Sequence, residues 1–179
     1  MAGKRGTTLL LVPFAIAFAV SPFVTREVAG QPQMKLSSRA FQQSRKIPTR
    51  FSCEGKEVSP PLTIEGVPKE AKSLALVMDD PDAPGGNWVH WVLWNIDPAT
   101  TQIAEGSVPR GAEQGINSWQ RKGYGGPCPP SGEHRYYFRL YALSQRLGLP
   151  SNSTRKDLER ALQGKVLAQS ELFGVYGRR

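Results

Sequence analysis

Both histidines of this 179-residue chain lie where a loop rich in glycine and proline runs into an apolar, aromatic segment. His90 follows the loop 81–87, and His134 follows the loop 123–133. If the two segments form neighbouring strands, both imidazole rings and the hydroxyl of Tyr136 open onto one pocket. Imidazole and phenol groups donate hydrogen bonds, so such a pocket would bind the oxygen atoms of one ligand.

A small anion is the ligand that this combination of residues favours. Gly126, in the segment GGPCPP, has a backbone N–H that an anion can approach closely because glycine has no Cβ. A carboxylate behind a histidine fixes its tautomer and raises its pKa, and Asp80 or Asp82 could take that role or bind a ligand's ammonium group. We therefore expect phosphate or a phosphomonoester with a cationic head, such as phosphoethanolamine. The predicted ligand-binding residues are Asp80, Asp82, His90, Gly126, His134 and Tyr136.

Each of these features also has a plainer structural interpretation. His90 alone would be a histidine packed in a strand, and Tyr136 alone would be a core residue. The segment DPDAP alone would be a turn in which aspartate caps backbone N–H groups. The coincidence of all of them at two strand entries is what favours a binding site.

Three kinds of catalysis are disfavoured by the same residues. Two histidines and two aspartates could hold a metal, but Pro81 and Pro84 restrain the acidic loop. Ser131 lies close to His134 in the sequence, yet the GxSxG segment of a hydrolase is missing. Cys128 is flanked by prolines and has no helix start nearby to lower its pKa. We expect neither an enzyme nor a bound metal or cofactor.

Three segments have the composition of β-strands, which favours a mainly β protein. Residues 73–78 form a short apolar run, and residues 88–96 are rich in β-branched and aromatic residues. Both faces of 88–96 are apolar, so we expect a central strand between two layers. With a period of two, one of its faces is predicted to hold Trp88, His90, Val92, Trp94 and Ile96. The third segment, 134–143, has a less polar face that holds His134, Tyr136, Phe138, Leu140 and Ala142.

The C-terminal part has the spacing of helices. Thr154 and Asp157 resemble a capping box, and the apolar residues that follow recur at helical spacing until Gly164. A second short helix is predicted over 166–172, before Gly174. Strands in the middle and two C-terminal helices together predict a mainly β (α+β) fold.

The first thirty residues resemble a secretory signal. Lys4 and Arg5 precede an apolar run, 9–20, and small residues follow up to Gly30. The run is shorter than the roughly 20 residues that a membrane span needs. We predict a signal peptide over 1–30, a single domain over 31–179, and export to a periplasm or the outside. The alternatives are an uncleaved anchor or a start codon assigned too early.

The chain is basic, with a formal net charge of +8. Loss of residues 1–30 would remove three basic residues and one acidic residue and leave +6. Positive charge favours anionic partners in general, but the basic residues are scattered and simple solubility explains them better. The sequence has no helix-turn-helix, zinc-finger or RNA-binding signature, so we expect no nucleic-acid partner.

The two cysteines, Cys53 and Cys128, both lie among turn residues. Export would allow them to form a disulfide, and the alternative, weighted equally, is two free thiols packed as small hydrophobic groups. Their spacing is not that of a CxxC or a Cys/His metal site.

Two long segments resemble a known family. MDDPDAPGGNWVHWVLWNI (78–96) and GYGGPCPPSGEHRYYFRLYAL (123–143) are similar to the phosphatidylethanolamine-binding protein (PEBP) family, in its bacterial Raf-kinase-inhibitor-like, or YbhB/YbcL-type, branch. The resemblance runs from about residue 36 to residue 179. It implies a large antiparallel sheet packed on a smaller one, C-terminal helices, an anion pocket made by the six residues named above, and a cis peptide at Ala83–Pro84. At 85–87 this chain is shorter than animal members of the family.

Three functions follow from these observations. The first is an exported, non-catalytic protein that holds a phosphate-type anion. The second is an inhibitor or regulator of a partner protein, of protease or kinase type, with the pocket secondary. The third is a hydrolase that uses His90 and His134. The resemblance adds a homodimer as a further partner, because bacterial members are often dimers.

Overall fold

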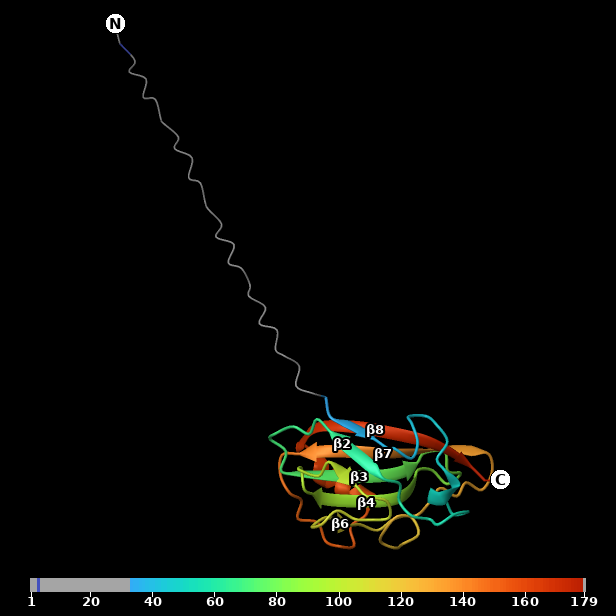
Figure 1. The fold of residues 1–179 in the computed structure, drawn as a ribbon. Coiled ribbons are helices and arrows are strands. Elements are labelled where there is room, and N and C mark those ends of the chain that lie inside the picture. Colours follow the sequence, from blue (N-terminus) through green and yellow to red (C-terminus); the bar gives the residue numbers. More distant parts are fainter. Residues whose placement is uncertain (1–2, 4–32, 179) are drawn as a thin grey trace.

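The computed structural model describes residue 3 and residues 33–178, which fold into two antiparallel sheets packed face to face (Figure 1). This architecture confirms the predicted fold class. The larger sheet has the strand order β6 (Glu113–Gln114), β4 (Trp88–Ile96), β3 (Ser73–Asp80), β7 (Glu133–Leu143) and β8 (Val166–Gly177). The smaller sheet has the order β1 (Lys35–Ser37), β2 (Leu62–Glu65) and β5 (Gln102–Ile103).

Strand β3 is buried along its whole length, which explains its continuous apolar sequence. Leu76 and Met78 belong to the main core between the two sheets, which also contains Leu62 and Ile64 of β2. The alternate residues of β3 face the other side of the large sheet. There, Val77 belongs to a second apolar cluster. Because β3 separates two cores, its last residues, Asp79 and Asp80, point to opposite sides of the sheet.

Strand β4 has the predicted bounds and two apolar faces, but the predicted face is wrong. Val92 and Trp94 pack in the second cluster, whereas Ile96 packs in the core between the sheets. The register of β4 with β3 shifts twice, and one extra β4 residue at each shift reverses the alternation. Asn95, with φ 57°, lies at one shift, and His90 lies at the other.

Strand β7 follows the prediction closely. Tyr136, Phe138, Leu140 and Ala142 all face the core between the sheets, and the intervening residues are more exposed. Its partner β8 contradicts the prediction, because residues 166–172 are extended rather than helical. They pair with β7 from Val166 onward. The periodicity of this short apolar run is compatible with either a helix or a strand, and the pairing with β7 makes it a strand.

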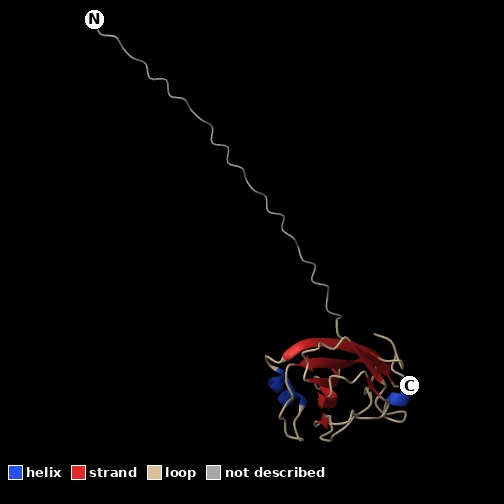
Figure 2. Ribbon diagram, turned by 60° about the vertical axis from the view of Figure 1, so that its left-hand side comes forward, coloured by secondary structure: helices blue, strands red, loops and turns tan. Residues whose placement is uncertain are grey.

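One α-helix is described, α1 (Arg155–Leu162), and it lies away from the short 3-10 turn η1 (Thr49–Phe51) in Figure 2. The predicted capping box is confirmed: the Asp157 N–H donates to the Thr154 hydroxyl, and the Thr154 N–H donates to Asp157. Leu158 and Leu162 belong to the second apolar cluster, together with Val77 of β3. Within residues 33–178 no helix is long and apolar enough to span a membrane. The predicted signal peptide, 1–30, lies almost entirely outside the described residues.

Two loop features complete the fold. Cys53 and Cys128 form a disulfide, with Cα atoms 5.5 Å apart, so the structure decides between the two alternatives for the cysteines. The predicted cis bond at Ala83–Pro84 is wrong, since no described peptide bond is cis. The Gly86 N–H donates to the Ala83 carbonyl at 2.9 Å, and Pro84 occupies the second position of this turn, where a trans proline fits.

Candidate functional site

His134 is held by an aspartate from the neighbouring strand. Strand β3 lies between β4 and β7, so the two histidine strands are not neighbours as the sequence analysis assumed. The intervening strand supplies Asp80, whose Oδ2 lies 2.7 Å from Nδ1 of His134. Both side chains are largely buried. Asp80 Oδ1 also accepts the Asp82 N–H at 2.8 Å. Asp80 therefore orients the imidazole, and Nε2 of His134 is left to bind a ligand.

His90 is held by the glycine-rich loop instead. Its Nδ1 donates to the Gly125 carbonyl at 2.7 Å, and the Gly125 N–H donates back to the His90 carbonyl at 3.0 Å. Burial lowers the pKa of His90, so the ring is neutral at pH 7. With Nδ1 protonated, Nε2 carries a lone pair and accepts a hydrogen bond. The carboxylate predicted behind a histidine is thus found at His134 and not at His90.

Tyr136 lies between the two histidines. Its ring centre is 5.2 Å from that of His90, edge to face, and 6.5 Å from that of His134, nearly parallel. The side chain is fully buried, and its hydroxyl makes no hydrogen bond of normal geometry with the residues that the structure describes, although Asp80 and the Cys128 backbone lie near enough to act on its pKa. Burial and then the negative charge of Asp80 raise its pKa well above the ordinary value. The phenol therefore stays protonated and keeps a donor to offer, and an unsatisfied buried donor needs an explanation.

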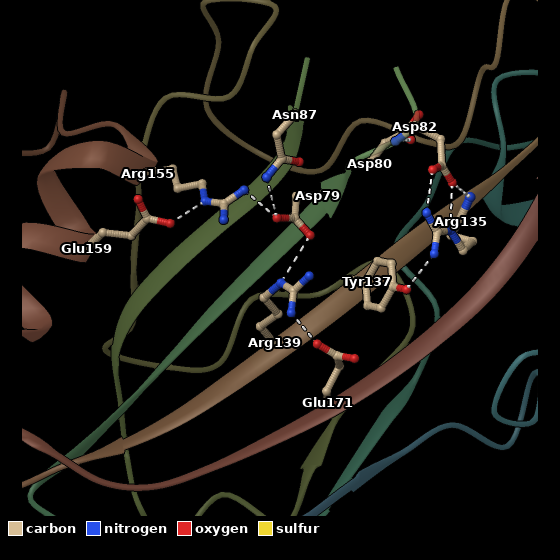
Figure 3. A network of polar contacts seen from close by, with 10 residues as sticks. All are labelled: Asp79, Asp80, Asp82, Asn87, Arg135, Tyr137, Arg139, Arg155, Glu159 and Glu171. Carbon is tan, nitrogen blue, oxygen red and sulfur yellow. Dashed lines mark hydrogen bonds and ion pairs between the residues drawn. The ribbon is translucent and has the colours of Figure 1, made fainter. Parts of the chain in front are cut away.

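Asp82 is the one predicted side chain that turns away from this group. Its carboxylate binds the Arg135 guanidinium through Nη2 at 2.6 Å and Nε at 2.9 Å (Figure 3), and Arg135 belongs to the more exposed face of β7. The Arg135 N–H also donates to it at 2.9 Å. These hydrogen bonds lower the pKa of Asp82 to about 2. A carboxylate that is already paired with arginine is a poor partner for a ligand's ammonium group.

The ion pair between Asp82 and Arg135 makes the stability of the fold depend on pH in the acid range. Because the pKa of Asp82 is lowered from 3.8 to about 2, its stabilising effect is present above pH 4 and is lost as pH falls through 2. We expect Arg135→Gln to lower the free energy of unfolding slightly at pH 7, since the pair is half exposed. Urea unfolding from pH 7 to pH 2 should show this difference vanish. A difference that persists at pH 2 would contradict it.

Gly126 lies where two loops are joined. A Cβ on this residue would come within 2.7 Å of the Phe51 carbonyl oxygen, so the close approach requires glycine. The Cys53 N–H donates to the Pro127 carbonyl at 3.1 Å, beside the disulfide to Cys128. The Gly126 N–H donates to Oε1 of Glu57 at 3.3 Å. The amide predicted to bind an anion thus contacts a carboxylate of the chain itself.

An aromatic rim next to His90 was missed by the sequence analysis. The Trp119 ring contacts His90 edge to face at 5.0 Å and Trp88 at 5.4 Å. Both tryptophans are 37% exposed, and the Arg121 guanidinium lies 5.7 Å from the Trp119 ring centre. A tryptophan in the polar loop segment NSWQRKG is the signal that could have revealed it.

Asp79 and its partners were also missed. The Asp79 side chain is fully buried on the outer side of the sheet and contacts two arginines, Arg139 of β7 at 3.3 Å and Arg155 of α1 (Figure 3). Asn87 donates to it at 2.9 Å. These four residues form what we call the Asp79 network, which ties α1 and the 81–87 loop to the sheet. The consecutive acids Asp79 and Asp80 and the two arginines on one face of β7, Arg135 and Arg139, are the signal in the sequence.

Two cavities are lined by residues other than Tyr136 and the two histidines. One of about 730 Å³ is lined by residues such as Gln33, Arg139 and Glu171, and one of about 530 Å³ by Asn87 and Arg155 among others. No group of three or more metal-ligating side chains occurs among the described residues.

Comparisons with known proteins give the same class as the fold, a two-sheet binding-protein fold of the PEBP type. A crystal structure of a PEBP homologue from Chlamydia trachomatis is 42% identical, with a TM-score of 0.80 over 82% of this chain and 99% of that one. YbcL of Escherichia coli, described as a member of the mammalian PEBP family, is 32% identical with a TM-score of 0.77, at the same coverage.

The sequence comparisons make the assignment specific. The family description "Phosphatidylethanolamine-binding protein" matches residues 37–177. A UPF0098 protein of Methanothermobacter thermautotrophicus is 49% identical over 81% of this chain and 99% of its own length. Another from Aquifex aeolicus is 46% identical over 84% of this chain and 92% of its own. The chain belongs to the phosphatidylethanolamine-binding protein family, as its two long segments predicted.

Proposed function

We propose that this chain is a non-catalytic binding protein that holds a phosphate or phosphomonoester group at Tyr136, His134 and His90. The observation that carries the proposal is the buried Tyr136 hydroxyl, which stays protonated and makes no hydrogen bond of normal geometry with the described residues, Asp80 and the Cys128 backbone being its polar neighbours. Such a donor needs an acceptor, and a phosphate oxygen supplies one.

The histidines on either side complete a matched set of hydrogen-bonding groups. In the form that is protonated on both ring nitrogens, His134 donates from Nδ1 to Asp80 and from Nε2 to a second phosphate oxygen. Neutral His90 is an acceptor at Nε2, so it can receive the proton of a monoprotonated phosphate or of a ligand's hydroxyl group. The ammonium group of phosphoethanolamine would need a partner other than Asp82, which Arg135 occupies. Phosphate itself is therefore the group that the site is built to hold.

Removing one hydroxyl tests the proposal. We expect Tyr136→Phe to weaken phosphate binding by roughly 10- to 100-fold, because a hydrogen bond to a charged group contributes about 1.5–3 kcal/mol. The measurement follows both imidazole rings of the purified protein by NMR while phosphate, and then phosphoethanolamine, is added. In the unchanged protein, His90 and His134 should shift together and reach saturation.

Tyr137→Phe is the matched control. It removes the hydroxyl of the next residue, which lies on the opposite face of β7 and accepts a long contact from Arg135. Its phosphate affinity should equal that of the unchanged protein. If neither histidine responds to millimolar phosphate, or if both tyrosine variants bind alike, the anion site is wrong.

The exposed aromatic rim favours a second function, the inhibition or regulation of a partner protein. Trp88 and Trp119 beside His90 form the kind of exposed aromatic surface on which protein partners dock. Inhibition of a kinase or protease that Trp119→Ala abolishes, with phosphate affinity unchanged, would favour this function over the first.

Export is part of the proposal. Its supports are the signal-like composition of residues 1–30 and the disulfide between Cys53 and Cys128, a bond that persists in oxidising compartments. Cell fractionation of the full chain would test it, and retention of the whole chain in the cytoplasm would contradict it.

A further inference from the structure

We propose that Glu57 is a built-in competitor for the anion site, and that a bound phosphate takes the place of its carboxylate on Gly126 and Arg121. This inference rests on the proposed function and deepens it, because it names a residue that sets how tightly the site holds an anion.

The contacts of Glu57 are those that an external anion would make. Its Oε1 accepts the Gly126 N–H at 3.3 Å and an Arg121 N–H at 3.4 Å. One donor is a glycine amide of the loop that also holds His90, and the other is a guanidinium group. A phosphate oxygen binds both kinds of donor, and binds them more strongly than neutral acceptors do.

The carboxylate is held loosely enough to be exchanged. Both contacts are longer than the usual 2.9–3.0 Å of an N–H···O bond. The Glu57 side chain is 38% exposed and that of Arg121 is 55% exposed, and exposed ion pairs contribute little to stability. An incoming anion can therefore displace Glu57 without unfolding any element.

The backbone around Glu57 keeps its carboxylate close to the site. Glu57 has φ 52°, in the left-handed region that non-glycine residues seldom adopt. The neighbouring Lys56 N–H donates to the Arg50 carbonyl at 3.0 Å, and the disulfide of Cys53 fixes the same segment to the glycine-rich loop. The competing carboxylate is thus tethered next to Gly126 and returns when the ligand leaves.

The charge of Glu57 also acts on a partly buried tyrosine of the glycine-rich loop. The Tyr124 hydroxyl, which donates to the Phe51 carbonyl beneath the same loop, has a raised pKa. Burial is the main cause, and the negative charge of Glu57 adds to it. The same charge repels a phosphate dianion, so Glu57 opposes binding even before the two compete for donors.

Arg121 links this contact to the histidine side of the site. Its guanidinium lies over Trp119, whose ring contacts His90. When Glu57 leaves, Arg121 keeps its place on the tryptophan and becomes available to the anion. The exchange therefore replaces a long, exposed internal ion pair with a contact between Arg121 and the ligand.

A matched pair of substitutions tests the inference. Glu57→Gln and Glu105→Gln each remove one exposed carboxylate that is paired with one arginine, but Glu105 pairs with Arg50 and has no contact with Gly126 among those described. We expect Glu57→Gln to bind inorganic phosphate roughly tenfold more tightly, within the usual range of coupling between two sites. Glu105→Gln should change the affinity less than twofold.

The Gly126 amide provides a second measurement. In the unchanged protein its NMR signal should move as phosphate replaces the carboxylate, and the free protein's signal should already differ in Glu57→Gln. If phosphate binds in a Tyr136-dependent way but Glu57→Gln and Glu105→Gln have equal affinities, the inference is overturned and the proposed function stands. If phosphate binds to none of these proteins, the proposed function itself fails.

Discussion

Replacing Asp79 with alanine is expected to lower the free energy of unfolding by about 3–5 kcal/mol, the usual effect of removing one partner of a buried ion pair. Asp79 is fully buried and is bound by Arg139, Arg155 and Asn87. Its loss leaves two partly buried guanidinium groups facing each other, without the carboxylate that separates and neutralises them. Urea unfolding at pH 7 measures the change.

Glu159→Gln is the control for this prediction. It removes the outer partner of the same Arg155, but its side chain is 50% exposed, so we expect a loss of at most about 1 kcal/mol. Equal losses in the two variants would show that the buried position of Asp79 has no special importance.

The second large effect concerns the disulfide. Replacing Cys53 and Cys128 together with serine should lower the free energy of unfolding by about 4 kcal/mol, by the loop-closure relation for a crosslink across 75 residues. The bond joins the segment that carries Glu57 to the loop that carries Gly126, so these two loops should become the first part to exchange amide hydrogens. Reduction of the unchanged protein should reproduce the loss. A serine variant as stable as the oxidised protein would contradict the prediction.

The strands were predictable because their signals are local. The apolar runs at 73–78 and 88–96 and the alternation at 134–143 need no tertiary information, and β3, β4 and β7 follow them. The capping box at Thr154 was equally local. The two-sheet architecture was predicted from the resemblance of two long segments to the family, and the structure confirms it.

The features that could not be predicted depend on partners far away in the sequence. β8 is extended because β7 pairs with it, and no periodicity within 166–172 shows that. The alternation of β4 fails at two register shifts, which exist only in relation to β3. Asp82 points away from the histidines because Arg135, from another strand, binds it. The contacts of Glu57 with Gly126 and of Trp119 with His90 likewise join distant parts of the sequence, so only the folded structure shows them.

The end of β3 has a consequence for how this chain can vary. Asp79 and Asp80 are adjacent in the sequence but have different partners. Asp79 binds Arg155 of α1 on one side of the sheet, and Asp80 orients His134 on the other. Inserting one residue within the strand would reverse the parity of every position after it, placing the first carboxylate against His134 and removing the second from it. Single-residue insertions and deletions can therefore be accommodated only in the flanking loops, 66–72 and 81–87. The residue spacing of β3 therefore fixes both the Asp79 network and the orientation of His134.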